Sequence, residues 1–125
     1  MVYDVSEQRV WLVDGHNAVT RTYLVSGSRH PHLLAPGTYT VFSRSLHAIG
    51  FNHKETMQYM VRFANGKHSA IGFHDIPVSD ASGRLVQSRG QLGTPLSAGC
   101  IRQWRPDAKA LWRFALNGTT VVVTA

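Results

Sequence analysis

Cys100 is the only cysteine of the chain, and it stands in a run of small residues, PLSAGCIRQW. A single cysteine has no partner for an internal disulfide, so its thiol is either a small apolar group or a reactive nucleophile. A nucleophilic cysteine needs a base for its proton and N–H groups that stabilise negative charge. Gly99 lets a ligand approach the backbone, and a helix predicted from Pro106 begins soon afterwards. These neighbours favour chemistry at Cys100.

Seven histidines compete for the role of the base, and His74 differs from the others. It ends an apolar strand pattern (AIGF), and the following loop leads back to Cys100, so the two residues can meet in space. The remaining histidines lie in predicted turns or beside polar stretches and are expected to be solvated: His16, His30, His32, His47, His53 and His68. One cysteine without a second thiol falls short of zinc-site spacing, so we predict no metal and no cofactor.

Strands are predicted to position these residues. Two β-rich runs, 10–13 and 18–25, flank the turn DGHN and indicate a hairpin. Alternating apolar residues, with Asn65-Gly66 as a hairpin turn, predict four further strands, which are 38–44, 57–63, 69–74 and 119–124.

A long loop, 75–95, with one short strand at 85–87, and one helix complete the pattern. The helix begins at Pro106 and is ended by Asn117-Gly118; its apolar face consists of Ala108, Leu111, Trp112 and Ala115. We therefore predict a mainly β fold, a sandwich with one main helix near the C-terminus, in a single domain 1–125. The large apolar residues are expected in the core or the cleft wall, and they are Trp11, Trp104, Trp112, Met57 and Met60.

Composition restricts the partners. Thirteen Lys and Arg against seven Asp and Glu give a net charge of +6 across 125 residues, which favours an anionic partner. The basic residues are scattered without helix stripe or zinc-finger spacing, so we predict no nucleic-acid partner. No apolar run approaches the roughly 20 residues that span a bilayer. The first residues lack the pattern of a secretory signal, and we expect any export signal to lie upstream.

Two segments resemble the active-site signature of the L,D-transpeptidases, the YkuD-type catalytic domain. They are FHDIP at 73–77 and LGTPLSAGCIR at 92–102. Members of this family carry a histidine and, later, a Ser/Thr-x-Gly-Cys-x-Arg or Asn segment. GTYTVFSRS at 37–45 and DAKALWRFALNGTTVVVT at 107–124 resemble further family segments, so that the likeness covers nearly all of 10–124.

The resemblance implies a role for each residue of the signature. Cys100 would attack a stem tetrapeptide of peptidoglycan at its diamino acid, expel the terminal D-alanine and form a thioester. His74 would be the general base, oriented by the backbone carbonyl of Asp75 or by its carboxylate. Gly99 and Cys100 would supply oxyanion N–H groups.

Ser97 would shape the loop, and Arg102 would be a structural residue or a contact to a substrate carboxylate. Two departures stand out: Ala98 replaces a histidine common in relatives, and the loop between the histidine and the signature is longer than in many members. The resemblance predicts a cell-wall transpeptidase outside the cytoplasmic membrane that carbapenems acylate; a single cysteine suits an oxidising compartment. Alternatives are an L,D-carboxypeptidase, with water as acceptor, and a non-catalytic peptidoglycan-binding module.

Overall fold

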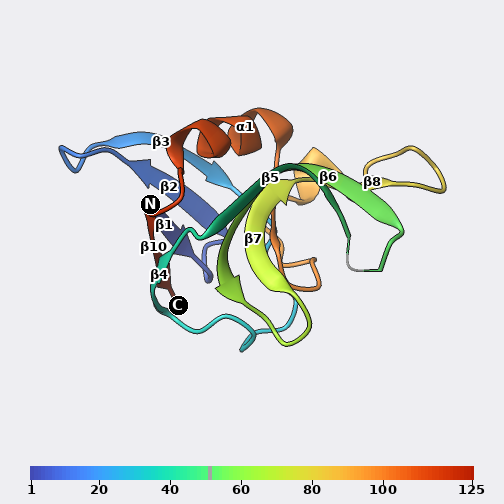
Figure 1. Cartoon of the computed structure of the whole chain (residues 1–125), viewed down its shortest axis with the longest axis horizontal. Coiled ribbons are helices and arrows are strands. Elements are labelled where there is room, and N and C mark those ends of the chain that lie inside the picture. Colours follow the sequence, from blue (N-terminus) through green and yellow to red (C-terminus); the bar gives the residue numbers. More distant parts are fainter. Residues whose placement is uncertain (51) are drawn as a thin grey trace.

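Two β-sheets pack against each other, and one end of both is covered by a helix (Figure 1). The computed structural model describes residues 1–50 and 52–125. The first sheet has the strand order β3-β2-β1-β10-β4. Its strands are β1 (Val2–Asp4), β2 (Arg9–Val13), β3 (Val19–Leu24), β4 (Gly37–Thr40) and β10 (Thr120–Thr124). Neighbouring strands are antiparallel except β1 and β10, which run parallel.

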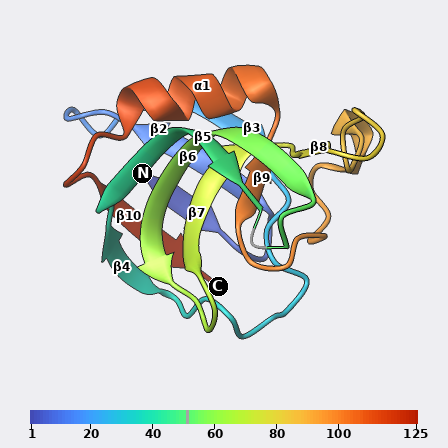
Figure 2. The ribbon, with the colours of Figure 1, turned by 45° about the vertical axis from the view of Figure 1, so that its right-hand side comes forward.

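The second sheet has the order β5-β6-β7-β9, with a short β8 beside the start of β6. Its strands are β5 (Ser43–Ile49), β6 (Glu55–Asn65), β7 (Ala70–Asp75), β8 (Val78–Ser79) and β9 (Ile101–Gln103). A 3₁₀ turn, η1 (Arg89–Gln91), lies in the loop after β8, and the helix α1 (Arg105–Phe114) follows β9. Figure 2 shows β5, β6 and β7 in front of β1, β2 and β10. The sheet that carries the signature residues therefore has one inner face and one outer face.

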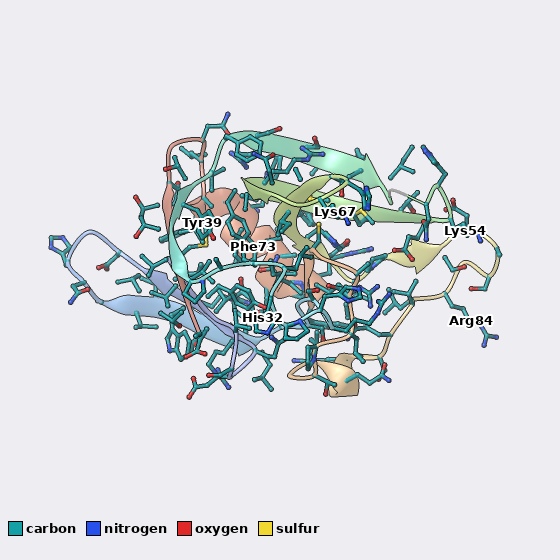
Figure 3. All side chains as sticks on the ribbon, turned by 90° about the horizontal axis from the view of Figure 1, so that it is seen from below. His32, Tyr39, Lys54, Lys67, Phe73 and Arg84 are labelled. Carbon is teal, nitrogen blue, oxygen red and sulfur yellow. The ribbon has the colours of Figure 1, made fainter. Side chains whose placement is uncertain are left out.

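Aromatic residues fill the space between the sheets. Phe73 of β7, which is labelled in Figure 3, is fully buried and stacks on Phe63 of β6, with ring centroids 4.8 Å apart. Tyr3 of the first sheet meets the ring of Phe73 edge-on at 6.0 Å, and Tyr39 meets Phe63 in the same way at 5.7 Å. Such offset and edge-on pairs add to the energy of burial. They fix β6 and β7, and with them the residues on the outer face.

β6 bends in the middle, where its partner changes. It pairs with β8 at its first residues and with β7 from Val61 onward. Tyr59 between these two stretches has a φ of 60°, in the left-handed region that non-glycine residues rarely occupy. Because this residue interrupts the strand alternation, Met57 and Met60 both line the same cavity on the outer face. The bend thus curves the sheet around the site.

The mainly β fold with one helix near the C-terminal end is confirmed for the described residues. The hairpin of β2 and β3 is also observed, with the Asp14 carboxylate accepting hydrogen bonds from the N–H groups of His16 and Ala18 in the turn. The helix begins one residue before Pro106 and ends at Phe114, before the predicted stop at Asn117-Gly118.

Two predictions about strands are wrong. The segment 38–44 is not one strand, because the chain crosses at the buried Val41 from β4 in the first sheet to β5 in the second. At 85–87, Leu85 forms only an isolated bridge with Val78. The short strands β1 and β9 were not predicted. No helix of the described residues is long and apolar enough to cross a membrane.

Candidate active site

β7 and β9 bring the signature residues together. The two strands run parallel, with Phe73 opposite Ile101 and His74 opposite Arg102. Cys100 directly precedes β9 and is therefore level with Gly72. Because side chains alternate along a strand, His74 and Cys100 belong to the same face of the sheet. Ile101 is buried in the core, so this shared face is the outer one.

A cavity of about 360 Å³ lies on this outer face. His74, Cys100 and Arg102 all line it. The bent β5–β6 ribbon and the turn between β6 and β7 supply most of its other walls, which include Ala48, Ile49, Met57, Met60, Arg62, Lys67, His68 and Ser69. Met57 and Met60 are thus both wall residues, as expected. The cavity offers an apolar surface beside a thiol, an imidazole and several charged side chains.

The backbone carbonyl of Asp75 orients the ring of His74. The carbonyl oxygen lies 2.5 Å from Nδ1, and a carbonyl can only accept, so Nδ1 carries the proton. Nε2 then keeps a lone pair and is the nitrogen that can take a proton. The pKa of His74 is lowered to about 4. Burial is the largest cause and the positive charge of Arg102 adds to it, while the hydrogen bond to the Asp75 carbonyl raises the pKa and offsets part of the shift. His74 is neutral at neutral pH.

The carboxylate of Asp75 has a different task. It is 1% exposed, accepts a hydrogen bond from the N–H of Gln58 at 2.8 Å and forms an ion pair with Nε of Arg105 at 2.9 Å. Burial raises the pKa of Asp75, and these two donors oppose the rise. Of the two alternatives left open by the sequence, the carbonyl therefore meets the ring, while the carboxylate ties β7 to β6 and α1.

Burial also raises the pKa of the Cys100 thiol above its usual value. Three groups oppose this rise: the N–H of Gly72, then the charges of Arg62 and Arg102. The sulfur lies 3.7 Å from the carbonyl oxygen of Ala70.

The prediction that the N-terminus of the helix stabilises negative charge at Cys100 is wrong. β9 intervenes between the cysteine and α1, and Arg105 at the start of α1 meets Asp75 at the far end of β7. The groups that favour the thiolate are instead the N–H of Gly72 and the charges of Arg62 and Arg102, against the larger effect of burial.

Ser97 closes the loop in front of the cysteine. Its hydroxyl donates to the carbonyl oxygen of Cys100 at 2.5 Å and accepts from the N–H of Gly99 at 3.2 Å. Ser97 is 2% exposed, so the loop is held from inside. The N–H of Gly99 is engaged by this hydroxyl, and an oxyanion role for Gly99 stays a prediction that requires this bond to open.

Arg102 is anchored by two residues that the sequence did not indicate. Its Nη1 donates to Oε1 of the buried Gln87 at 3.1 Å, and Nε2 of Gln87 donates to Oγ of Ser26 at 3.0 Å. The backbones of Arg102 and Ser26 also exchange hydrogen bonds of 2.8 and 2.9 Å. The long loop after β7 thus reaches back to hold a cation beside the cavity. A lone polar residue in a loop gives no pattern that would reveal this role.

Gly72 was also missed, although a glycine inside a strand pattern signals a close backbone approach. A Cβ at this position would lie 2.6 Å from the carbonyl oxygen of Val61, which is too close for any side chain. The sulfur of Met60 would also lie only 3.0 Å from this Cβ, so the missing side chain lets Met60 pack between Arg62 and Cys100. Within residues 1–50 and 52–125 no group of three or more His, Cys, Asp or Glu could hold a metal ion.

A sequence model of the YkuD family, the L,D-transpeptidase catalytic domain, matches residues 1–123. The chain belongs to this family. The resemblance to the L,D-transpeptidase family is thereby confirmed, and L,D-transpeptidases of this family are cell-wall enzymes. The chain is 27% identical over 124 residues to a Bacillus subtilis (strain 168) protein described as "Putative L,D-transpeptidase YciB". That alignment covers 97% of the chain and 63% of the relative.

Solved L,D-transpeptidases share the fold. The LD transpeptidase LdtMt1, in complex with imipenem, superposes with a TM-score of 0.78 at 17% identity, covering 98% of this chain and 57% of that one. The L,D-transpeptidase from Mycobacterium smegmatis gives a TM-score of 0.73 at 19% identity, covering 99% of this chain and 57% of that one. The chain therefore spans less than two thirds of the length of these relatives.

Proposed function

We propose that this YkuD domain is a cysteine-dependent L,D-transpeptidase that crosslinks stem peptides of peptidoglycan in the cell wall, outside the cytoplasmic membrane. The observation that carries the proposal is the placement of Cys100 and His74 on the same face of neighbouring strands, both lining one cavity. Membership of the L,D-transpeptidase family supplies the substrate class. The net charge of +6 suits an anionic polymer.

The first step transfers the acyl group to Cys100. His74 takes the thiol proton at Nε2, and the sulfur attacks the carbonyl carbon of the diamino acid. When the tetrahedral intermediate collapses, the C–N bond to the terminal D-alanine breaks. The leaving amine receives the proton from His74, and a thioester remains on the enzyme.

The second step transfers the acyl group to an acceptor. The amine of a neighbouring stem attacks the thioester, a C–N bond forms and the C–S bond breaks. His74 accepts the proton of the amine, and the thiolate of Cys100 is reprotonated. Water in place of the amine would give an L,D-carboxypeptidase from the same acyl-enzyme.

The resting pair is neutral under this proposal. Burial raises the pKa of Cys100 and lowers that of His74, so thiol and imidazole coexist at neutral pH. Proton transfer then accompanies the attack instead of preceding it. The charges of Arg62 and Arg102 stabilise the thiolate as it forms, because a low-dielectric cleft strengthens such interactions.

Mass spectrometry after incubation with a disaccharide tetrapeptide tests the function. A dimer that has lost one D-alanine indicates a transpeptidase, while a tripeptide alone indicates a carboxypeptidase. Cys100→Ala should abolish both products and keep the fold, as judged by circular dichroism. Activity in this variant would contradict the cysteine mechanism, and an inert wild-type protein would favour a binding module.

Imipenem gives a second test that needs no peptide. LdtMt1 is described in complex with this carbapenem, and we propose that imipenem acylates Cys100. Intact-mass analysis should find one adduct on the wild-type protein, located by peptide mapping at Cys100, and none on Cys100→Ala. An adduct that persists in the variant would contradict the assignment.

A further inference from the structure

Arg62 shares a row with the cysteine on the outer face of the second sheet. Arg62 of β6 pairs with Gly72 of β7, and the register of β7 with β9 places Cys100 on the far side of Gly72. Strands lie about 4.8 Å apart, so the Cα atoms of Arg62 and Cys100 are about 10 Å apart. Gly72 between them has no side chain. Met60 Sδ lies 3.0 Å from the position that a Cβ of Gly72 would take, and Arg62, Met60 and Cys100 all line the cavity.

Neutral groups hold Arg62 in place. Its Nη1 donates to the hydroxyl of Ser43 at 3.2 Å and to that of Ser45 at 2.8 Å, both on the neighbouring strand β5. In residues 1–50 and 52–125, its hydrogen bonds engage Nη1 alone, and Arg62 has no carboxylate partner. By contrast, Arg21 and Arg105 each pair with an aspartate. The two serines orient the guanidinium without neutralising it.

The charges around the cavity also favour an anion. Arg62, Lys67 and Arg102 line it together with one acidic residue, Glu55. Glu55 acts on Arg102, whose pKa it raises against the larger effect of burial. Arg62 is the cation whose hydrogen-bonding partners are hydroxyls alone. A guanidinium with a free Nε–Nη2 edge matches a carboxylate with two parallel hydrogen bonds.

We propose that Arg62 binds a carboxylate of the acyl donor and thereby positions the scissile carbonyl in the cavity, next to Cys100. This inference rests on the proposed function, because it names the residue that selects the substrate of that site. The chemistry it recognises is one of the two carboxylates next to the scissile bond, on the terminal D-alanine or on the diamino acid, and not one further along the stem. Arg62 is a substrate-binding residue, and Ser43 and Ser45 are positioning residues.

Alkylation of Cys100 tests the anion site without any peptide. The thiolate attacks the CH₂ carbon of iodoacetate or iodoacetamide and releases iodide, and the two reagents differ in charge. Loss of Arg62 raises the pKa of the thiol for both reagents alike, so the ratio of their rates isolates anion binding. Arg62→Gln should lower the iodoacetate to iodoacetamide ratio roughly tenfold, as expected for a charge-assisted hydrogen bond. Arg113→Gln, an exposed arginine of α1, is the control and should keep the ratio.

Two milder variants, Arg62→Lys and Ser45→Ala, distinguish a loss of anion binding from a general loss of folded structure. Arg62→Lys should retain part of the preference for iodoacetate, because the charge stays while the planar fork is lost. Ser45→Ala should lower the ratio by a smaller factor, since it loosens the guanidinium without removing it. An unchanged ratio in a folded Arg62→Gln protein overturns the proposal, as does an equal loss in Arg113→Gln.

Peptide substrates then identify the carboxylate. Three tetrapeptides are compared in the acylation step: the free acid, the C-terminal amide and the peptide with an amidated diamino acid. Loss of thiolate stabilisation slows all three peptides alike, and Arg62→Gln should slow the free acid roughly tenfold more than the peptide whose bound carboxylate is amidated. An equal effect of Arg62→Gln on all three peptides overturns the proposal. If the wild-type protein acts on no peptide while the alkylation ratio still depends on Arg62, the proposed function fails and the anion site stands.

Discussion

A single carbonyl oxygen decides what His74 can do. Because the Asp75 carbonyl accepts a hydrogen bond from the N–H of Nδ1, the basic nitrogen of the ring is Nε2. Burial keeps this ring uncharged, and burial also keeps Cys100 protonated. The pair therefore differs from cysteine sites in which a thiolate and an imidazolium exist before substrate arrives.

The pH dependence of alkylation should reveal this neutral pair. The rate of Cys100 with iodoacetamide should rise steadily through neutral pH, and its midpoint should lie above the roughly 8.5 of an ordinary thiol, because burial raises the pKa of Cys100. Stopped-time alkylation followed by intact-mass analysis from pH 5 to 10 measures it. A plateau that extends down to pH 5 would show a preformed thiolate and refute the neutral pair.

At the scale of elements, the contact of β6 with β7 depends on one glycine. A Cβ on Gly72 would meet the carbonyl oxygen of Val61 at 2.6 Å, and two paired strands cannot separate locally without losing their hydrogen bonds. A Cβ on Gly99 would meet a methyl group of Leu33 at 3.2 Å, and that flexible side chain can move.

The two glycines form a matched pair for a stability experiment. Gly72→Ala should destabilise the protein by about 3 kcal/mol, and Gly99→Ala should cost less than about 1 kcal/mol, as overpacking against backbone is worse than overpacking against a side chain. Urea unfolding of both variants measures the difference. Similar values for the two would mean that β6 and β7 can adjust, and the close approach would not be the reason for Gly72.

The carboxylate of Asp75 joins three elements, since it belongs to β7 and binds the N–H of Gln58 in β6 and the side chain of Arg105 in α1. Asp75→Asn keeps an acceptor and should cost about 1–2 kcal/mol, whereas Asp75→Ala leaves a buried donor unpaired and should cost about 3 kcal/mol. Asp107→Asn breaks the more exposed pair with Arg21 and should cost less than about 1 kcal/mol. Unfolding free energies in urea give all three values, and equal losses would remove the special role of Asp75.

The sequence predicts those features of the fold and the site that depend on residues close together in the chain, and it does not predict those that depend on contacts between distant segments. His74, Cys100 and the β2–β3 hairpin carry local patterns, and the fold class follows from strand periodicity and one amphipathic helix. The strands β1 and β9 have three residues each; β9 depends on the distant Ala70–Asp75, and β1 lies between β2 and the distant Thr120–Thr124. The contacts of Arg62 and Gln87 likewise exist only once β5, β6 and the long loop are in place. Periodicity cannot reveal such contacts, because they arise from tertiary structure.

For the molecule as a whole, the buried neutral His74 lowers the stability of the folded protein at acidic pH. The unfolded chain protonates this histidine near pH 6.5, while the folded protein does so only near its pKa of about 4. The unfolded state therefore binds more protons between these values, and the free energy of unfolding falls as the pH falls through this window. Asp75 acts in the opposite direction, because its pKa is raised on folding and the folded protein takes up its proton more readily.

Comparison of His74→Gln with the wild-type protein isolates this contribution. The amide can still donate to the Asp75 carbonyl, but it does not titrate, so the variant should lose less stability on acidification. Between pH 7 and pH 4 the stability difference between the two proteins should change by roughly 3 kcal/mol in favour of the variant. Urea unfolding curves at half-unit pH intervals measure it, with His16→Gln, at an exposed turn histidine, as the matched control substitution. If the unfolding free energies of His74→Gln and the wild-type protein changed with pH in the same way, His74 would titrate alike in the folded and the unfolded chain. The neutral resting pair at the active site would then have to be abandoned, because the same burial is responsible for both.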